Sequence, residues 1–472
     1  MNLRAITLRA LPFADAASDD LPLGQLLRLA LFQVSVGMAS VLLLGTLNRV
    51  MIVELSVAAV VVAVMIALPV LVAPFRAMLG FRSDTHRSAI GWKRIPYLWY
   101  GAMWQFGGLA IMPSALLVLG GDVVHDVPFA GEVLAALAFL MTGLGLHMTQ
   151  TAGLALASDR ATDETRPRVV ALLYVMFLVG MGVSALVIGW LLSDFTSLGL
   201  IKVVQGAAVV GLALTGIALW KQEHVKPMSR AERDAPRPKF SDAWNDFASG
   251  GSAGRLLVVV FLGTMAFSMQ DVLLEPYGGE ILGLSVAATT LLTAMWALGA
   301  LIGFALAARV LSRNGNPYRM AGIGLLAGVM AFSIVIFAAP MQSTLLFYIG
   351  AGMIGFGAGY FAVSTLTAAM TMPAGGLAGR GLVLGAWGAA QATAAGLSIA
   401  IGGGLRDWVN SMALNGDLGI ALNSPATGYS VVYHVEIALL FVTLAALGPL
   451  VRAGRRTTTY QGNRLGLADF PT

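Results

Sequence analysis

Long runs of apolar residues alternate with short polar connections along almost the whole chain. Each run has about 18–25 residues, the length that an α-helix needs to cross about 30 Å of hydrocarbon. The runs are continuous, whereas transmembrane β-strands give short segments of alternating polarity. The pattern therefore predicts an all-α polytopic membrane protein with twelve transmembrane helices, at residues 26–47, 56–75, 96–119, 133–157, 169–192, 199–220, 256–277, 285–308, 320–339, 345–372, 381–404 and 429–451.

The basic residues fall on alternate sides of this pattern. Of the 29 lysines and arginines, 26 lie in the N-terminal region up to Arg28, in the even-numbered connections or in the tail, and Arg49, Lys202 and Arg406 fall on or near the other face. Cytoplasmic loops are enriched in lysine and arginine, so both termini are expected in the cytoplasm. No cleavable signal peptide is apparent before the first span. We expect a multi-pass protein of a bacterial inner membrane.

Composition narrows the possible chemistry. The chain is 57% apolar and 11% charged, and it has no cysteine. The lack of cysteine excludes disulfides, thiol catalysis and thiolate metal sites, and the five histidines are too scattered for a zinc motif. The net charge of +5 follows from the membrane topology, so no nucleic-acid partner is expected. No nucleophile–base pairing or nucleotide-binding loop is apparent, and the protein is not expected to be an enzyme.

A polar linker divides the chain into two halves of six spans each. Within it, Phe240, Trp244 and Phe247 recur at helical spacing. This spacing favours an amphipathic helix at the membrane surface over a solvated tether. The expected organisation is a cytoplasmic N-terminal segment, a first half, the linker, a second half and a cytoplasmic tail, at residues 1–25, 26–220, 221–254, 255–451 and 452–472.

Glycines recur within several predicted spans. Span 10 contains a G-x-G-x-x-G string, but it lies inside a membrane helix and not between a strand and a helix, so a dinucleotide site is rejected. Instead, Gly355 and Gly359 form a small-x-x-x-small face that predicts close packing of helices.

The connections of the two halves resemble each other. Gly80-Phe81-Arg82-Ser83-Asp84, followed by Arg87, is similar to the start of the G-x-x-x-D-R-x-G loop of the major facilitator superfamily. The second-half copy, Ser312-Arg313-Asn314-Gly315, keeps the arginine and the glycine but has serine at the acidic position. With the division into six plus six spans, these loops imply the pseudo-symmetric fold of that superfamily. The resemblance also implies that Asp84 bridges spans at a cytoplasmic gate.

Other segments resemble a narrower family. Span 7 contains Met269-Gln270-Asp271 and Leu274-Glu275-Pro276-Tyr277-Gly278-Gly279, and further blocks are Leu47–Met51, Gly91–Tyr97 and Gly385–Gln391. They resemble the PucC/LhaA family, the bacteriochlorophyll-delivery members of the major facilitator fold in purple bacteria. This resemblance implies assembly of light-harvesting complexes in the photosynthetic membrane, with bacteriochlorophyll a as the pigment. The implied partners are the light-harvesting α/β polypeptides, the reaction centre–LH1 core, pigment-synthesis enzymes and membrane lipid.

Ionisable residues inside a span are costly and are therefore functional candidates. Asp271 and Glu275 are four residues apart, which places them on one face of span 7 beside Gln270, and Pro276 is expected to end the regular helix. They would line a polar site for a pigment, a proton or a partner. Alternatively, they form a structural network with Arg49.

Two histidines are candidate axial ligands for the magnesium of a bacteriochlorophyll; no direct protein metal site is expected. A macrocycle bound to a helix covers the preceding turn, which requires a small residue four positions earlier. His147 has Gly143 at that position, and His434 has Ser430. The alternative for His147 is a hydrogen bond to a neighbouring span, and for His434 it is contact with water.

Three functions remain open. The first, implied by the resemblance to the PucC/LhaA family, is a light-harvesting assembly factor that binds or delivers bacteriochlorophyll. The second is a secondary transporter of a small solute or pigment intermediate, coupled to protons through Asp271 or Glu275. The third is a passive scaffold without pigment.

Overall fold

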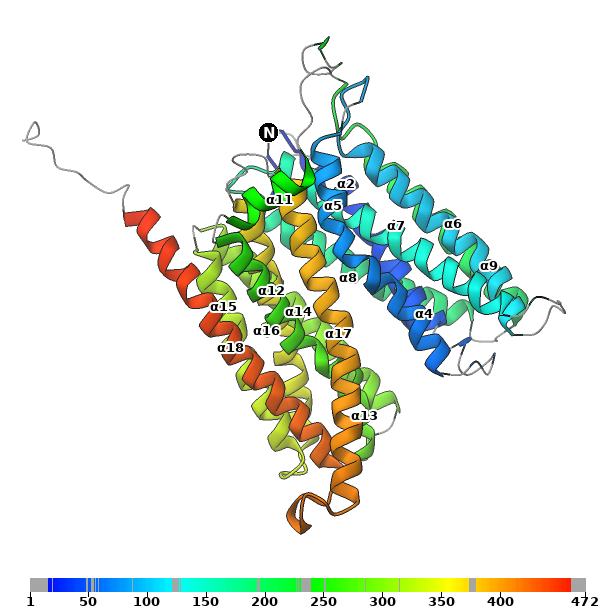
Figure 1. The fold of residues 1–472 in the computed structure, drawn as a ribbon, viewed down its shortest axis with the longest axis vertical. Helices are drawn as coiled ribbons and strands as arrows, with labels where there is room; N and C mark the ends of the chain where they lie inside the picture. The colour runs from blue at the N-terminus through cyan, green and yellow to red at the C-terminus, as the bar shows by residue number, and fades with distance from the viewer. Residues whose placement is uncertain are drawn as a thin grey trace, which may run out of the picture. The chain divides into compact units, whose positions relative to one another are not determined.

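The computed structural model describes residues 16–459, and all regular elements in that range are helices (Figure 1). The residues outside the description within that range are 19, 48–49, 52–54, 56, 58, 87, 121–126, 128, 193–195, 226, 228, 231–238, 250–251, 285, 314 and 373–378.

The elements follow the predicted spans in order. The helices before the linker are α2 (Leu23–Val41), η2 (Leu42–Thr46), α4 (Ala59–Val72), η4 (Ala73–Phe75), α5 (Arg76–Asp84), α6 (Ile95–Leu119), α7 (Ala130–Arg160), α8 (Arg166–Leu191) and α9 (Ser197–Leu219). From the linker onward they are α11 (Phe240–Ser249), α12 (Ser252–Ser268), η5 (Met269–Val272), α13 (Leu274–Glu280), α14 (Val286–Leu311), α15 (Pro317–Ala338), α16 (Thr344–Thr371), α17 (Arg380–Leu414), η6 (Ile420–Leu422) and α18 (Ala426–Thr459).

Eleven helices among the described residues are long and apolar enough to cross a membrane. The remaining predicted span, 56–75, corresponds to α4 and η4. The 14 residues of α4 are too few to cross alone, but α4, η4 and α5 follow one another without a break. Bulky apolar side chains on the helix surfaces, such as Leu186 at 77% and Trp190 at 75% exposure, suit contact with lipid tails. The fold is therefore that of a polytopic α-helical membrane protein.

Local sequence signals account for several helix starts. Pro96 and Pro167 lie in the first turns of α6 and α8, where a missing N–H is tolerated. Asn316 caps α15, and its side chain accepts hydrogen bonds from the N–H groups of Tyr318 and Arg319.

Close helix contacts depend on residues without bulky side chains, as predicted from the small-x-x-x-small faces. A Cβ atom at Gly355 of α16 would lie 1.9 Å from the carbonyl oxygen of Trp296 in α14. A Cβ at Gly359 would lie 2.7 Å from the carbonyl oxygen of Ala300. The glycines thus allow the backbones of α14 and α16 to approach each other.

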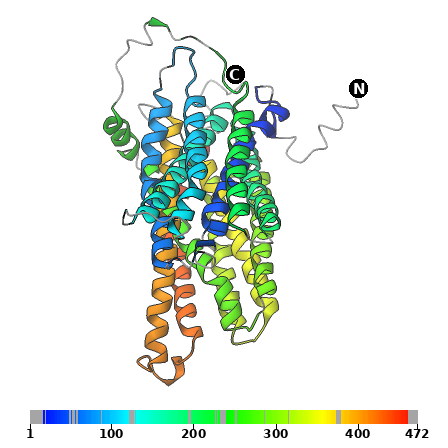
Figure 2. The same cartoon turned by 90° about the vertical axis from the view of Figure 1, so that its right-hand side faces the viewer.

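The chain divides into two compact units. The first contains the described residues of 1–249 and 369–400, and the second those of 250–368 and 401–472. The N-terminal part of α17 thus groups with the first six spans, unlike the boundary predicted from the linker alone. Within the first unit α6 packs against α7 and α9, and within the second α18 packs against α12 and α15. Figure 2 shows the C-terminal end of α17 beside the start of α18, joined by a connection that contains η6.

The helix predicted in the linker is present as α11. The ring of Phe240 meets that of Phe81 of α5 at 5.5 Å between centroids, and Phe247 is buried. The apolar face of α11 therefore packs against the end of α5 in the first unit.

Candidate functional site

Span 7 is interrupted in its middle. Helix α12 ends at Ser268, a 3-10 turn covers Met269–Val272, and α13 begins at Leu274. The expectation that Pro276 ends the regular helix was wrong. The change occurs earlier, and Pro276 lies in the first turn of α13, where proline is tolerated. The family-like sequence Met-Gln-Asp therefore forms the break itself.

The break brings two predicted residues together with one that the sequence analysis missed. The backbone N–H of Gln270 donates to Oε1 of Glu436 in α18 at 2.7 Å, and the Gln270 side chain donates to Asp271. Glu436 is fully buried, and its Oε2 has no hydrogen-bond partner among the described residues. It is the one carboxylate in the apolar run 429–451, a signal that the sequence already carried.

Two other residues were expected at this polar site. The side chain of Glu275 and the whole of Arg49 lie outside the described residues. In the described part of the site, the carboxylate that reaches the helix break comes from Glu436.

His147 forms a hydrogen bond to a neighbouring span, the alternative to pigment ligation. Its Nε2 lies 2.9 Å from the carbonyl oxygen of Pro69 in α4, so Nε2 carries the proton and donates. The preceding turn is also filled, because a Cβ at Gly143 would lie 2.5 Å from Cβ of Pro69. Helix α4 occupies the space that a macrocycle would need. This arrangement gives His147 and Gly143 a packing role.

Arg76 is a second missed residue in the first unit. Its side chain is buried, Nε donates to Oγ1 of Thr151 at 3.0 Å, and Nη1 donates to the carbonyl oxygen of Gly388 at 3.2 Å. A Cβ at Gly388 would lie 2.5 Å from the guanidinium carbon. A larger residue at 388 would therefore force the guanidinium of Arg76 to shift.

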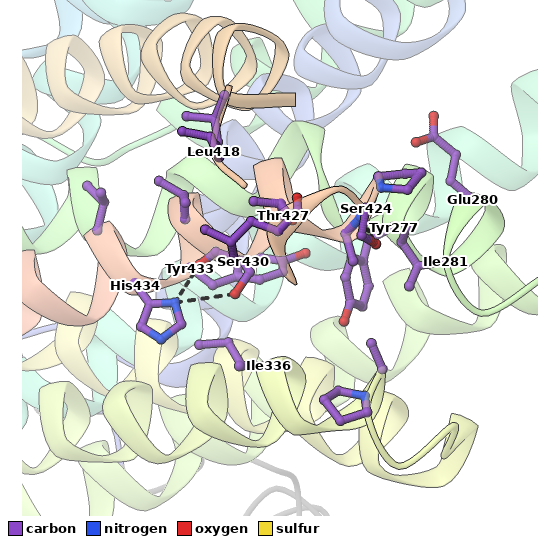
Figure 3. Close-up of a pocket in the computed structure, with 18 of the residues that line it drawn as sticks. Tyr277, Glu280, Ile281, Ile336, Leu418, Ser424, Thr427, Ser430, Tyr433 and His434 are labelled. Atoms are coloured by element: carbon purple, nitrogen blue, oxygen red, sulfur yellow. Dashed lines mark hydrogen bonds between the residues drawn. The ribbon is translucent and has the colours of Figure 1, made fainter. Parts of the chain in front are cut away.

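The second unit contains a groove of about 1170 Å³ (Figure 3). Its walls are the ends of α13, α15 and α17, the connection after α17, and the first turns of α18. The lining is largely apolar, with the aromatic side chains of Tyr277, Trp408 and Tyr433. Tyr277 belongs to the Leu-Glu-Pro-Tyr-Gly-Gly segment. The volume is slightly above the usual range of about 300–1,000 Å³ for a small-molecule site.

His434 lines this groove from α18. Its Nδ1 lies 2.7 Å from the carbonyl oxygen of Ser430 and 3.4 Å from the Ser430 hydroxyl (Figure 3). Since a carbonyl can only accept, Nδ1 carries the proton and Nε2 carries the lone pair. The imidazole is exposed, and no hydrogen bond to Nε2 occurs within the described residues. His434 therefore offers a coordinating nitrogen, which His147 does not.

Charged residues form a cluster at the start of α17 in the first unit. Asp84 accepts hydrogen bonds from the N–H groups of Gly381 and Leu382, both at 2.8 Å, and pairs with Arg94. A carboxylate at a helix N-terminus is stabilised by the helix dipole. Asp84 thus bridges α5, the start of α6 and α17.

Arg94 is the centre of this cluster. Its Nε also pairs with Asp159 at 3.0 Å, and Asp159 reaches Arg380 at 3.5 Å. Burial lowers the pKa of Arg94, but the charges of Asp159 and Asp84 outweigh burial and raise its pKa above the ordinary value. Arg94 belongs to the family-like block Gly91–Tyr97, and this position could have indicated its place in the charged cluster.

The remaining predicted gate residues have different surroundings. Gly80 is in close contact with α17, because its Cβ would lie 1.8 Å from the carbonyl oxygen of Gly381. Arg313 is exposed. Arg87 lies outside the described residues.

Helical architecture and comparison with solved structures define the class of protein. A bacterial homologue of the iron transporter ferroportin, in an outward-facing state, superposes with a TM-score of 0.69 at 15% identity, covering 90% of this chain and 98% of that one. The proton:xylose symporter XylE, of the major facilitator superfamily, superposes with a TM-score of 0.60 at 15% identity, covering 90% and 95%. The chain is therefore a multi-pass membrane protein with a major facilitator fold.

Sequence comparison identifies the family. The PUCC protein family matches residues 46–455. The chain is 60% identical over 471 residues to an uncharacterized protein of the puhA-bchM intergenic region of Rhodobacter capsulatus, covering 99% of this chain and 98% of that one. It is 57% identical over 406 residues to Protein PucC of Rhodovulum sulfidophilum, covering 85% and 89%. A more distant relative, 27% identical over 440 residues, is the bacteriochlorophyll synthase 44.5 kDa chain of Rhodobacter capsulatus, covering 91% and 96%. The chain belongs to the PucC family.

Proposed function

We propose that this protein is an assembly factor for light-harvesting complexes and that it binds bacteriochlorophyll a as cargo. The proposal is supported by membership of the PucC family and by a relative whose name refers to bacteriochlorophyll synthesis. The protein would carry the pigment to newly inserted light-harvesting α/β polypeptides. We propose that it acts as a carrier and not as an enzyme.

The observation that carries the proposal is the orientation of His434 in the groove. The hydrogen bond from Nδ1 to the carbonyl oxygen of Ser430 fixes the tautomer and the ring. The lone pair of Nε2 is thereby free for the central magnesium of a bacteriochlorophyll. The magnesium would accept this nitrogen as an axial ligand.

The groove also suits the body of the pigment. Its volume of about 1170 Å³ and its largely apolar lining fit a large flat ring. Trp408, 63% exposed, offers an aromatic face for stacking. Since the groove is open at its surface, a pigment would be able to leave without unfolding of the helices.

The proposed partners follow from the cargo. They are the light-harvesting α/β polypeptides, the reaction centre–LH1 core and enzymes of pigment synthesis. The site of action would be the inner or intracytoplasmic photosynthetic membrane, with both termini in the cytoplasm, as the charge distribution indicates.

Purification from a pigment-making host tests this proposal. We expect the wild-type protein to retain bacteriochlorophyll, detected by its near-infrared spectrum and by solvent extraction. His434→Ala should lose most of it. His224→Ala is the matched control, because His224 is exposed in the polar connection after α9. A wild-type protein without pigment, or equal pigment in all three proteins, would contradict the proposal.

A second function is favoured by the interrupted span 7. Broken helices form coupling-ion sites in many transporters, and here Gln270, Asp271 and Glu436 meet at the break. This arrangement suits a proton-coupled transporter of a small solute or pigment intermediate. Proton uptake by vesicles, compared between wild type and Glu436→Gln, tests it. Absence of gradient-driven flux with every pigment intermediate tried would remove its support.

A further inference from the structure

The charges around the groove are unbalanced. Among the described residues that line it, Glu280 is the one carboxylate, and no lysine or arginine lines it. Figure 3 shows Glu280 and His434 toward opposite ends of the groove, with Tyr277 between them. A ligand whose metal is held at His434 would therefore extend toward an acidic end.

Arg406, which contacts Glu280 at this end, is already paired with two protein carboxylates. Nη2 of Arg406 lies 2.5 Å from Oε2 of Glu280, and Nη1 lies 2.7 Å from Oδ1 of Asp407. The hydroxyl of Tyr429 donates to the same Glu280 oxygen at 2.8 Å, and the guanidinium lies over the Tyr429 ring at 4.5 Å. Two carboxylates face one guanidinium, so this end has a net negative charge.

We propose, building on the proposed function, that the groove selects a neutral, esterified magnesium chlorin and excludes the corresponding free carboxylic acid. The free acid carries a negative charge that would meet an end with one negative charge in excess, because the single guanidinium of Arg406 is paired with both Glu280 and Asp407. Like charges repel, and water moderates this repulsion because the Glu280 side chain is 50% exposed and the Asp407 side chain is 71% exposed. The ester has the same ring without this charge. Glu280 is thus the specificity-determining residue, and His434 is the ligand common to both pigments.

This selectivity places the protein in a reaction sequence. The cargo must come from an esterification that joins the carboxyl group of the chlorin to an alcohol. The pigment then binds in its finished, neutral form. An unesterified precursor would not compete for the groove.

Binding of three pigments to the purified full-length protein tests the inference. The probes are bacteriochlorophyll a, bacteriochlorophyllide a with a free acid, and the methyl ester of bacteriochlorophyllide a. The methyl ester is decisive, because it differs from the acid in charge and has no long tail. Titrations followed by the shift of the near-infrared band should show the methyl ester binding about threefold more tightly than the acid.

Two variants assign the effect to the acidic end. Glu280→Gln should strengthen binding of the acid and leave the methyl ester within about twofold. Asp407→Asn keeps the pair between Glu280 and Arg406. It should reduce the difference in affinity between the acid and the methyl ester by less than Glu280→Gln does. Equal affinity of acid and methyl ester in the wild type would overturn the selectivity while leaving the pigment site intact. Failure of all three pigments to bind, or no effect of His434→Ala, would instead contradict the proposed function.

Discussion

The imidazole of His434 is oriented by the backbone of Ser430, and the serine side chain contributes little. Nδ1 lies 2.7 Å from the carbonyl oxygen and 3.4 Å from the hydroxyl. The shorter contact fixes the tautomer that leaves Nε2 free. Any residue at position 430 that keeps the helix supplies the same carbonyl.

Substitution of the two residues is therefore expected to have unequal effects. Ser430→Ala should change the dissociation constant for bacteriochlorophyll a by less than about twofold, because the carbonyl remains. His434→Ala should weaken binding by at least about tenfold, because the axial nitrogen is lost. Titration of each purified variant measures both values. Equal losses in the two variants would show that the hydroxyl, and not the carbonyl, positions the ring.

His147 is expected to affect stability and not pigment content. Its substitution by alanine removes the hydrogen bond to Pro69 and leaves a cavity between α7 and α4. These losses together cost about 2 kcal/mol or more. The apparent Tm in detergent should fall, while the pigment bound per protein stays unchanged. Loss of pigment at an unchanged Tm would instead indicate that His147 is a pigment ligand.

Much of the fold was predictable because span length, charge segregation and the linker are properties of the sequence. The interruption of span 7 was not predictable, since Met269–Val272 contains neither proline nor glycine. The break is compensated from α18 by Glu436, a contact between residues far apart in the chain. Similarly, Gly143 preceding His147 satisfied the sequence pattern for a pigment ligand. Only the packing of Pro69 shows that the space is filled.

Glu436 is expected to stabilise the break through one hydrogen bond. Its Oε1 accepts from the N–H of Gln270 at 2.7 Å. Glutamine at this position keeps an oxygen acceptor, whereas leucine leaves a buried N–H unpaired at a cost of about 1–3 kcal/mol. Glu436→Leu should therefore lower the apparent Tm more than Glu436→Gln does. Thermal unfolding followed by circular dichroism measures the difference, and a smaller loss in the leucine variant would contradict this role.

Gly80 and Gly182 provide a matched pair for the contact between α5 and α17. A Cβ at Gly80 would lie 1.8 Å from the carbonyl oxygen of Gly381, whereas a Cβ at Gly182 of α8 would have no atom within 4 Å. Because backbone cannot move aside as a side chain can, Gly80→Ala must separate the two helices.

We expect Gly80→Ala to lower the apparent Tm by several degrees, as typical overpacking costs about 1–3 kcal/mol. It should also weaken the hydrogen bonds that Asp84 accepts from the N–H groups of Gly381 and Leu382. Hydrogen exchange at the start of α17 should therefore be faster. Gly182→Ala should leave exchange unchanged and raise helix stability by about 0.5–1 kcal/mol, because alanine loses less backbone entropy. Equal Tm and exchange rates in the two variants would show that the contact of Gly80 with α17 does not hold this end of the unit together.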